Sequence, residues 1–212
     1  IAENSASYGG GVAVVGGAQY DDTIIEPKDL SAADTILRLE AVDIRHNTAL
    51  AEGGGVHNLG GRVDAESCLI RFNDAGPAGL GGGLYAQASR SSRIANTLIA
   101  ENRAFDGGGV HLYRDLLLSV ADQDRFINVL VVGNTAHSEG GGFFWMDAYP
   151  KIAHSTISQN SATLMGGIYA TRTTFGVFEK AQIVNSIVFY NVRTLATGGI
   201  VHPTLMTQIH EA

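Results

Sequence analysis

The sequence is short of several residue types that mark common classes of protein. Among its 212 residues there are one cysteine, four prolines and three lysines. The lone cysteine, Cys68, excludes a disulfide framework, and its place in an apolar run favours a buried thiol. The formal net charge of −7 argues against nucleic acid as a partner, because phosphate binding needs a basic patch.

Motifs and long apolar runs are also missing. No run approaches the roughly 20 apolar residues of a membrane-spanning helix, and no signal peptide is visible. There is no Gly-x-Ser-x-Gly nucleophile turn, no Gly-x-x-x-x-Gly-Lys phosphate loop and no zinc-ligand spacing. No stretch shows helical periodicity over three turns. These absences favour an all-β chain and indicate no particular catalytic chemistry.

Glycine, by contrast, is abundant, with 27 residues, and it recurs in pairs and triplets. Seven times an asparagine is followed, five to eight residues later, by a glycine block and then an apolar residue. Successive asparagines are 26 to 43 residues apart, which is typical of a solenoid. The asparagines are Asn4, Asn47, Asn73, Asn102, Asn134, Asn160 and Asn191.

Aligned on the asparagine, other positions form columns. A β-branched residue stands three residues before it, an alanine usually stands two after it, and a weaker polar column lies six before it. Short alternating runs bounded by Gly and Asn predict strands, three to each period. We therefore predict an all-β, right-handed parallel β-helix of about seven coils, one domain over residues 1–212, with coils about 4.8 Å apart.

The columns also predict positions within the coil. Asparagine tolerates the left-handed backbone region, so the asparagines should stack at one corner and hydrogen-bond along the axis. The glycine blocks suit a second corner, where a positive φ or close backbone approach is needed. The β-branched column should form an interior ladder that includes Ile70, Ile99, Val131 and Ile157.

An apolar-x-x-Asn segment paired with a Gly-Gly-apolar segment resembles a known repeat. The pairs include Ile44-Arg-His-Asn47 with Gly54-Gly-Val56, and Ile157-Ser-Gln-Asn160 with Gly166-Gly-Ile168. They are similar to the β-helix repeats of polymorphic outer-membrane proteins and autotransporter passengers. The resemblance implies an extracellular or cell-surface location and an adhesin-like stalk. It implies no single function, because the same coil also carries lyases, hydrolases and phage tail proteins.

Insertions and ends depart from the repeat. Residues 16–38 stretch the first period, and residues 31–37 are compatible with one or two helical turns. Shorter insertions lie near residues 76–80, 114–125 and 170–179, where solenoids often shape a binding face. Ile1-Ala-Glu-Asn4 starts in mid-coil without a cap, which predicts further chain or a partner subunit at that end.

One column of rings is a candidate ligand site. The second residue after the glycine block should point outward if its apolar neighbour points inward. Stacked rings there could hold sugar rings or a partner protein; the alternative is that they only pack on one another. Trp145, next in sequence to this column, should point inward. The predicted ligand-binding residues are His57, Tyr85, His111, Phe144 and Tyr169.

Carboxylates are the remaining candidates. Asp21 and Asp22 are weak candidates for Ca²⁺ ligands, with simple solvation as the alternative, and no other cofactor is predicted. Asp106, Asp122, Asp124 and Asp147 could serve as acids or bases but form no recognisable motif.

We therefore expect a noncatalytic stalk, or a component of a larger assembly, that binds a polysaccharide or a protein. The alternative is a carbohydrate-active enzyme of the pectate-lyase-like (pectin lyase-like) fold, a polysaccharide lyase or a glycosidase. An enzyme should bring Arg, Lys or Asp from adjacent coils into one groove beside an insertion, whereas a stalk should not.

Overall fold

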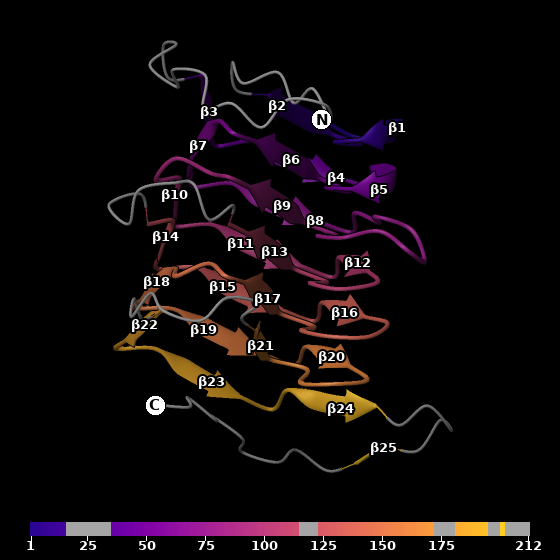
Figure 1. The fold of residues 1–212 in the computed structure, drawn as a ribbon, viewed down its shortest axis with the longest axis vertical. Helices are drawn as coiled ribbons and strands as arrows, with labels where there is room; N and C mark the ends of the chain where they lie inside the picture. Colours follow the sequence, from indigo (N-terminus) through magenta and orange to yellow (C-terminus); the bar gives the residue numbers. More distant parts are fainter. Residues whose placement is uncertain (16–34, 115–122, 172–180, 195–199, 202–212) are drawn as a thin grey trace.

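The computed structural model describes residues 1–15, 35–114, 123–171, 181–194 and 200–201. Within these ranges every regular element is a strand, and the coils pile up along one axis as a parallel β-solenoid (Figure 1). No helix in these ranges is long and apolar enough to span a bilayer. The predicted fold class is confirmed.

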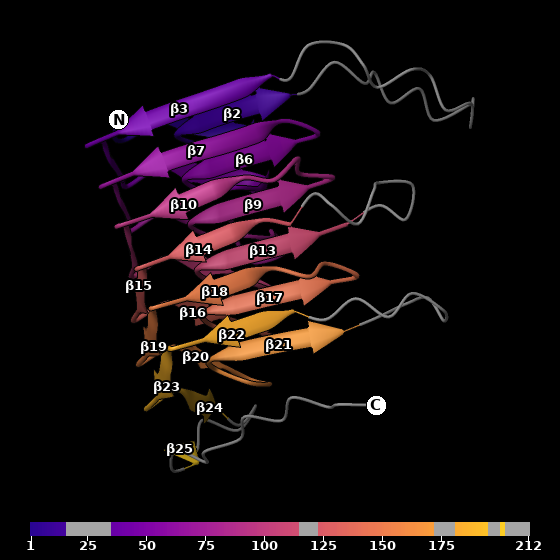
Figure 2. The same ribbon diagram turned by 90° about the vertical axis from the view of Figure 1, so that its left-hand side faces the viewer.

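Four series of strands run along the axis (Figure 2). Sheet 1 contains β3 (Ile36–Glu40), β7 (Arg62–Glu66), β10 (Arg93–Ala95), β14 (Arg125–Ile127), β18 (Lys151–Ala153) and β22 (Gln182–Val184). Sheet 2 contains β4 (Asp43–Arg45), β8 (Leu69–Arg71), β11 (Leu98–Ala100), β15 (Leu130–Val132), β19 (Thr156–Ser158) and β23 (Ile187–Phe189).

The other two series follow the asparagine and the glycine block. Sheet 3 contains the pair β1 (Ser5–Tyr8) and β5 (Thr48–Glu52), and then β12 (Arg103–Ala104), β16 (Thr135–Ala136), β20 (Ser161–Ala162), β24 (Val192–Thr194) and β25 (Ile200–Val201). Sheet 4 contains β2 (Val12–Val15), β6 (Val56–Leu59), β9 (Leu84–Gln87), β13 (Val110–Tyr113), β17 (Phe143–Met146) and β21 (Ile168–Thr171). All pairings are parallel except β24 with β25.

Two details differ from the sequence prediction. Sheets 1, 2 and 4 have six strands each within the described residues, so the coil count is slightly below seven. A coil also contains a fourth strand, in sheet 3, which is as short as two residues in β12, β16 and β20. A two-residue strand leaves no alternating pattern, so the sequence signal for it is weak.

The interior is the predicted ladder. Ile70, Ile99, Val131 and Ile157 are each at most 1% exposed, and strand register places them directly above one another. Trp145 is also in the core, edge-on to Phe143 with ring centroids 6.4 Å apart. Cys68 is buried, as expected of a small apolar residue.

The asparagines stack at one corner, as predicted. Asn102 donates through Nδ2 to the Ile70 carbonyl at 2.9 Å and to Oδ1 of Asn134 at 3.0 Å. Its own Oδ1 accepts from the backbone N–H and from Nδ2 of Asn73, both at 3.0 Å. The same pattern recurs from Asn4 to Asn191, and the five inner members are fully buried.

The left-handed residue at this corner is not the asparagine but the residue before it. His46, Phe72 and Gln159 have φ between 54° and 57°, and Gly133 fills the position once. The polar column six residues before the asparagine is also left-handed, as at Asn96 and Asn128. The asparagine side chain makes the hydrogen bonds of this corner, and the residue before it adopts the strained positive-φ backbone conformation.

The glycine corner meets both predicted requirements. The first glycine of the block has a positive φ, as in Gly53 and Gly107, with Met165 in that position once. The second glycine faces backbone of the next coil: a Cβ on Gly108 would lie 2.5 Å from the carbonyl of Thr135. A side chain there is therefore sterically excluded.

Of the long insertion, residues 36–38 lie in strand β3, so the predicted helical turns do not include Ile36 or Leu37. Residues 16–34, with Asp21 and Asp22, lie outside the described residues. Three undescribed segments (16–34, 115–122 and 172–180) each join a strand of sheet 4 to a strand of sheet 1. The larger insertions are thus concentrated at one corner of the coil.

We predict that Asn102→Ala will lower the free energy of unfolding by roughly 2–6 kcal/mol, because the Asn73 N–H and the Ile70 carbonyl lose buried partners. Asn4→Ala, at the exposed end of the stack, is the control and should cost less than about 1.5 kcal/mol. Chemical denaturation measures both. Equal losses for the two variants would contradict the role of burial.

We also predict that Gly108→Ala will destabilise the fold by at least about 3 kcal/mol, since the contacted atoms are backbone and cannot rotate away. Gly76→Ala is the control: its Cβ would meet nothing closer than 3.4 Å, so it carries only the strain of φ +80°, about 1 kcal/mol. A melting temperature for Gly108→Ala at or above that of Gly76→Ala would refute the close approach.

Candidate functional site

The predicted ring column is continuous. Ring centroids of His57 and Tyr85 are 5.4 Å apart, those of His111 and Phe144 are 4.5 Å apart, and both pairs are stacked nearly face to face. Tyr169 continues the stack below Phe144 at 5.5 Å. Five consecutive rungs of sheet 4, from β6 to β21, thus present one ring each, whereas β2 has Ala13 at this position.

The expected exposure of this column is wrong for four of its five members. His57, Tyr85, His111 and Phe144 are between 2% and 4% exposed, and Tyr169 is half-buried. Rings stacked at these distances cover each other's faces, so no face is open for a sugar. Ligand binding by the ring column stays a prediction, but the geometry is that of packing.

Carboxylates lie along one edge of the ring column, in the residue before the glycine block. Glu52 Oε2 is 3.0 Å from His57 Nε2. Burial raises the pKa of Tyr85, and the charge of Glu52 raises it further. Glu139 accepts a hydrogen bond from Tyr169. Burial raises the pKa of both Asp106 and Glu139, and in Glu139 repulsion from Asp106 adds to it.

These carboxylates support the rings rather than form a metal centre. The Asp106 carboxylate accepts the backbone N–H of Glu139 at 2.9 Å, which ties two coils together. In the part of the chain that the structure describes, no three His, Cys, Asp or Glu residues converge as metal ligands would. Asp21, Asp22 and Asp122 lie outside that part, so Ca²⁺ binding by Asp21 and Asp22 stays a prediction.

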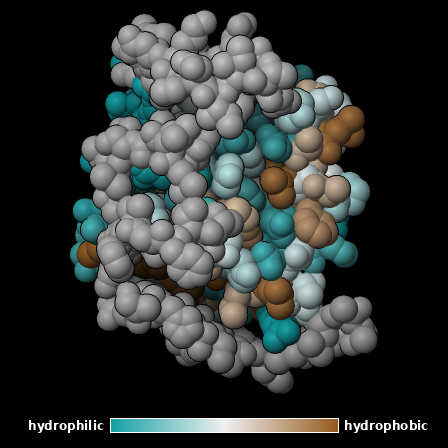
Figure 3. Space-filling view, in the orientation of Figure 1, coloured by the Kyte–Doolittle hydropathy of each residue, from teal (hydrophilic) through white to brown (hydrophobic). Residues whose placement is uncertain are grey.

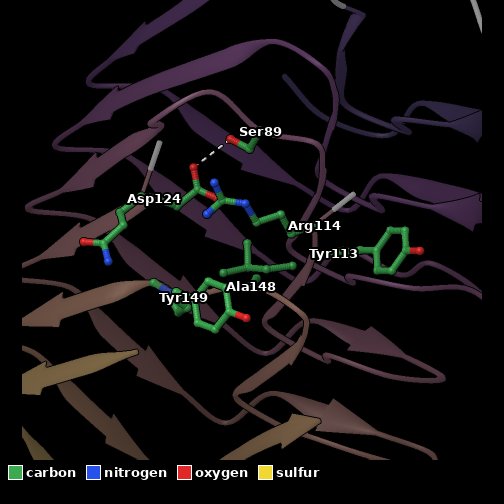
Figure 4. A pocket seen from close by; sticks show the side chains of 9 residues that line it. Ser89, Tyr113, Arg114, Asp124, Ala148 and Tyr149 are labelled. Atoms are coloured by element: carbon green, nitrogen blue, oxygen red, sulfur yellow. Dashed lines mark hydrogen bonds between the residues drawn. The ribbon is translucent and has the colours of Figure 1, made fainter. Parts of the chain in front are cut away.

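A small pocket lies at the corner between sheets 4 and 1 (Figure 4). Asp124 Oδ1 accepts from Ser89 Oγ at 2.7 Å and from the Ser92 N–H at 2.9 Å, and Arg114 points toward the same carboxylate. Burial raises the pKa of Asp124, and these hydrogen bonds oppose the rise. The pocket volume is about 10 Å³, which is room for one water molecule. The role of Asp124 that the structure shows is therefore to link the chain segments at this corner through its hydrogen bonds.

A larger hollow lies on the outer face of sheet 1, where the residue types in two outward-facing columns change from one coil to the next. The residues nine before each asparagine read Arg38, Asp64, Arg93, Arg125, Lys151 and Gln182 in register. The residues seven before it read Glu40, Glu66, Ala95, Ile127, Ala153 and Val184. The first column ends in cations and an amide, while the second turns from acidic to apolar.

The change creates space, because small side chains replace long ones. The hollow has a volume of about 620 Å³, within the usual range for ligand sites. Ile127 and Ala153 form its floor, and Arg125 and Lys151 come from adjacent coils. Its other lining residues are Gln123, His154 and Gln182. We refer to these seven residues as the hollow.

The cations of the hollow differ from two arginines higher on sheet 1. Arg62 pairs with Asp64 at 2.7 Å, and Arg93 pairs with Glu66, which also accepts from Asn96. Arg125 and Lys151 form no ion pair and no side-chain hydrogen bond with any described residue. Among the described residues the positive charges of the hollow therefore have no acidic partner, on a chain whose net charge is −7.

Elsewhere the surface has no broad apolar area in view. The face presented in Figure 1 shows apolar side chains in small separate patches among polar ones (Figure 3). Leu50 is a single exposed apolar residue, whereas on sheet 2 Leu130 is in register with Leu98 and Leu98 with Leu69, so these three form a short apolar column. Single exposed apolar side chains are ordinary, and they indicate no further site.

The chain matches no known family, and no curated protein or solved structure is significantly similar to it. The resemblance to polymorphic outer-membrane and autotransporter repeats therefore has no support from relatives, although the parallel β-helix itself is present. Function must be argued from the site alone.

Burial lowers the pKa of His111 to about 3, and its Nδ1 has no partner within the described residues. A depressed histidine pKa stabilises the fold above the unfolded pKa near 6.5, and that stability is lost as pH falls through 6.5 toward 3. We predict that His111→Phe, which keeps the ring, will lose less stability over this window. The difference should reach about 1.4 kcal/mol per pH unit.

Urea unfolding at several pH values measures this difference. The control variant is His57→Phe, which removes the second histidine of the ring column. His57 has a carboxylate partner, Glu52, that His111 does not have. Identical pH profiles for wild type and His111→Phe would show that His111 titrates normally.

Proposed function

We propose that this chain is a noncatalytic β-helix, secreted or at the cell surface, that binds glycans in the hollow on sheet 1. The observation that supports it is the pair Arg125 and Lys151, which lies beside an apolar floor and has no ion-pair partner among the described residues. Such a chain would act as an adhesin-like stalk or as part of a larger assembly. Its surface location is proposed from the repeat resemblance.

The lining of the hollow suits a sugar. Gln123 and Gln182 offer amide donors and acceptors for hydroxyl groups, and Arg125 and Lys151 add donors. Ile127 and Ala153 offer an apolar floor for the C–H face of a sugar ring. A few placed polar groups around an apolar floor is the usual composition of a small-ligand site.

The absence of a carboxylate pair supports a noncatalytic role. A glycosidase uses two carboxyl groups on either side of the scissile bond, and none of the described residues that line the hollow has a carboxyl group. Two half-buried carboxyl groups have raised pKa values and are held by hydrogen bonds: Asp106 accepts the backbone N–H of Glu139, and Asp124, in the small pocket beside the hollow, accepts from Ser89.

A second candidate is a polysaccharide lyase, the class that the sequence left open. It is favoured by the presence of His154 beside Arg125 and Lys151, from adjacent coils and next to two insertions. In a β-elimination a base takes the proton beside the sugar carboxylate, the cations stabilise the resulting charge, and the glycosidic C–O bond breaks. His154 is the residue in the hollow that could accept this proton.

Affinity electrophoresis through gels containing polygalacturonate, its methyl ester or dextran tests the proposed binding. Ala153→Phe fills the hollow and should abolish retention, because Ala153 lies on its floor. The control is Thr156→Phe, which adds the same ring on sheet 2 of the same coil and should be retained like wild type. Retention by none of the gels, or unchanged retention of Ala153→Phe, would overturn the proposal.

The same polysaccharides distinguish the two candidates. A noncatalytic protein releases no new reducing ends and produces no ultraviolet-absorbing unsaturated sugars. Product formation that disappears in His154→Ala would establish the lyase instead.

A further inference from the structure

The outer face of sheet 2 has two columns of side chains. Each three-residue strand points its middle residue inward and its two flanking residues outward, because side chains alternate along a strand. The first outer column contains Asp43, Leu69, Leu98, Leu130, Thr156 and Ile187. The second outer column contains Arg45, Arg71, Ala100, Val132, Ser158 and Phe189.

This face is complementary to itself. We infer that two copies of the chain pair side by side through sheet 2, with their solenoid axes parallel and a twofold axis running between them. The inference goes beyond glycan binding and is independent of it, since the hollow lies on sheet 1. It depends on the shape of the face, on the residue types that meet, and on its size.

The two outer columns differ in height over the middle rungs. Leu69 and Leu130 are 36% and 41% exposed, whereas Ala100 and Ser158, with shorter side chains, are 7% and 4% exposed. The first outer column is therefore a ridge, and the second is a shallow recess. About a twofold axis parallel to the solenoid axis, each column lies against the other column of the second copy. The ridge of one copy then enters the recess of the other.

Residue types also match rung by rung in this arrangement. Opposite charges meet on the first rung, hydroxyl groups meet on the fifth, and apolar side chains meet on the third, fourth and sixth. From the first rung to the sixth, the facing pairs are Asp43 with Arg45, Leu69 with Arg71, Leu98 with Ala100, Leu130 with Val132, Thr156 with Ser158, and Ile187 with Phe189.

The second rung is the one place where an apolar residue, Leu69, faces a charged one, Arg71. The Arg71 guanidinium is bound to Asp43 of its own copy at 2.8 Å, so Leu69 would meet the apolar stem of Arg71. Within each copy Arg45 also pairs with Asp43, at 3.2 Å. Facing pairs of Asp43 and Arg45 would give a cluster of alternating charge, which fixes the register of the two copies.

The opposite orientation of the two copies does not match. With antiparallel axes each column meets itself in reversed rung order, so Leu98 abuts Leu130, ridge against ridge. At the ends, Asp43 would face Ile187 and Arg45 would face Phe189. Burying these charges against apolar side chains costs free energy. The face therefore favours parallel pairing.

The size of the face indicates a weak dimer. Six rungs about 4.8 Å apart make it about 29 Å tall, and a strand with one residue on either side makes it about 16 Å wide. Contact over this face buries on the order of 900 Å² from the two copies together, less than the roughly 1,600 Å² of a standard interface. We therefore expect a dissociation constant on the order of 10 µM.

Sedimentation equilibrium over a concentration range on either side of this value tests the pairing. Wild type should pass from monomer to dimer, and Leu130→Arg should weaken the dimer at least about tenfold, because the ridge would carry a charge into an apolar recess. The matched control, Leu50→Arg, makes the same change at an exposed leucine of sheet 3 and should stay within about twofold of wild type. Circular dichroism confirms that both variants fold.

Distances between nitroxide labels in the dimer, measured by pulsed electron resonance, test the orientation. Cys68 is buried, so the labels attach to introduced cysteines. Glu40→Cys on the first rung and Asn128→Cys on the fourth should give similar distances between the two copies. In an antiparallel pair the Glu40→Cys labels would be separated by about 24 Å along the axis alone, because five rung spacings separate the two ends.

Three outcomes would overturn the inference. The first is a monomer at every concentration, and the second is a dimer that Leu130→Arg leaves unchanged or that Leu50→Arg weakens equally. The third is a Glu40→Cys label distance far longer than that of Asn128→Cys, which would show an antiparallel pair.

None of these outcomes bears on glycan binding by the hollow. Thr156→Phe, the control in the affinity gels, lies on the face of sheet 2 and is expected to weaken the dimer. In gels loaded well below the dissociation constant of the dimer, wild type is also a monomer, so the control stays valid there.

Discussion

The structure depends on the buried asparagine that links each coil to its neighbours. Through one side chain, Asn102 binds the Ile70 carbonyl of the coil above, accepts from Asn73 in that coil and donates to Asn134 in the coil below. A side chain of this length cannot make all three contacts if the coils slip by one residue. The asparagines therefore fix the register once per coil, in a place where water cannot compete for the hydrogen bonds.

Fixing the register at one corner frees the rest of the coil to vary in length. The hydrogen-bonded asparagines are 26 residues apart in one case and 43 in another, yet the ladder passes through both. The added residues leave the coil chiefly between sheets 4 and 1, the corner farthest along the chain from the asparagine of the same coil. That corner has no residue type that recurs in every coil, so individual hydrogen bonds, such as the one between Asp124 and Ser89, hold it locally.

What the sequence could predict follows from the same constraint. The asparagine stack, the Ile99 ladder and the glycine corner were predictable because each position needs nearly the same residue in every coil. The left-handed residue beside the asparagine was missed because its side chain is free to vary, from His46 to Gln159. The ring column was recognised, but the choice between an open stripe and a packed one stayed open, since alternation gives the direction of a side chain and not what lies against it.

The hollow was missed for the opposite reason: it depends on a column that does not repeat. Counting nine residues back from each asparagine shows Arg125 and Lys151 in succession, but the column also holds Asp64 and Gln182, so no repeated residue type separates it from ordinary solvated surface. In a solenoid the invariant columns maintain the stack, and they are full of groups already committed to structural hydrogen bonds. Specific recognition therefore has to come from columns that differ between coils, where two neighbouring rungs can present a combination found nowhere else along the axis.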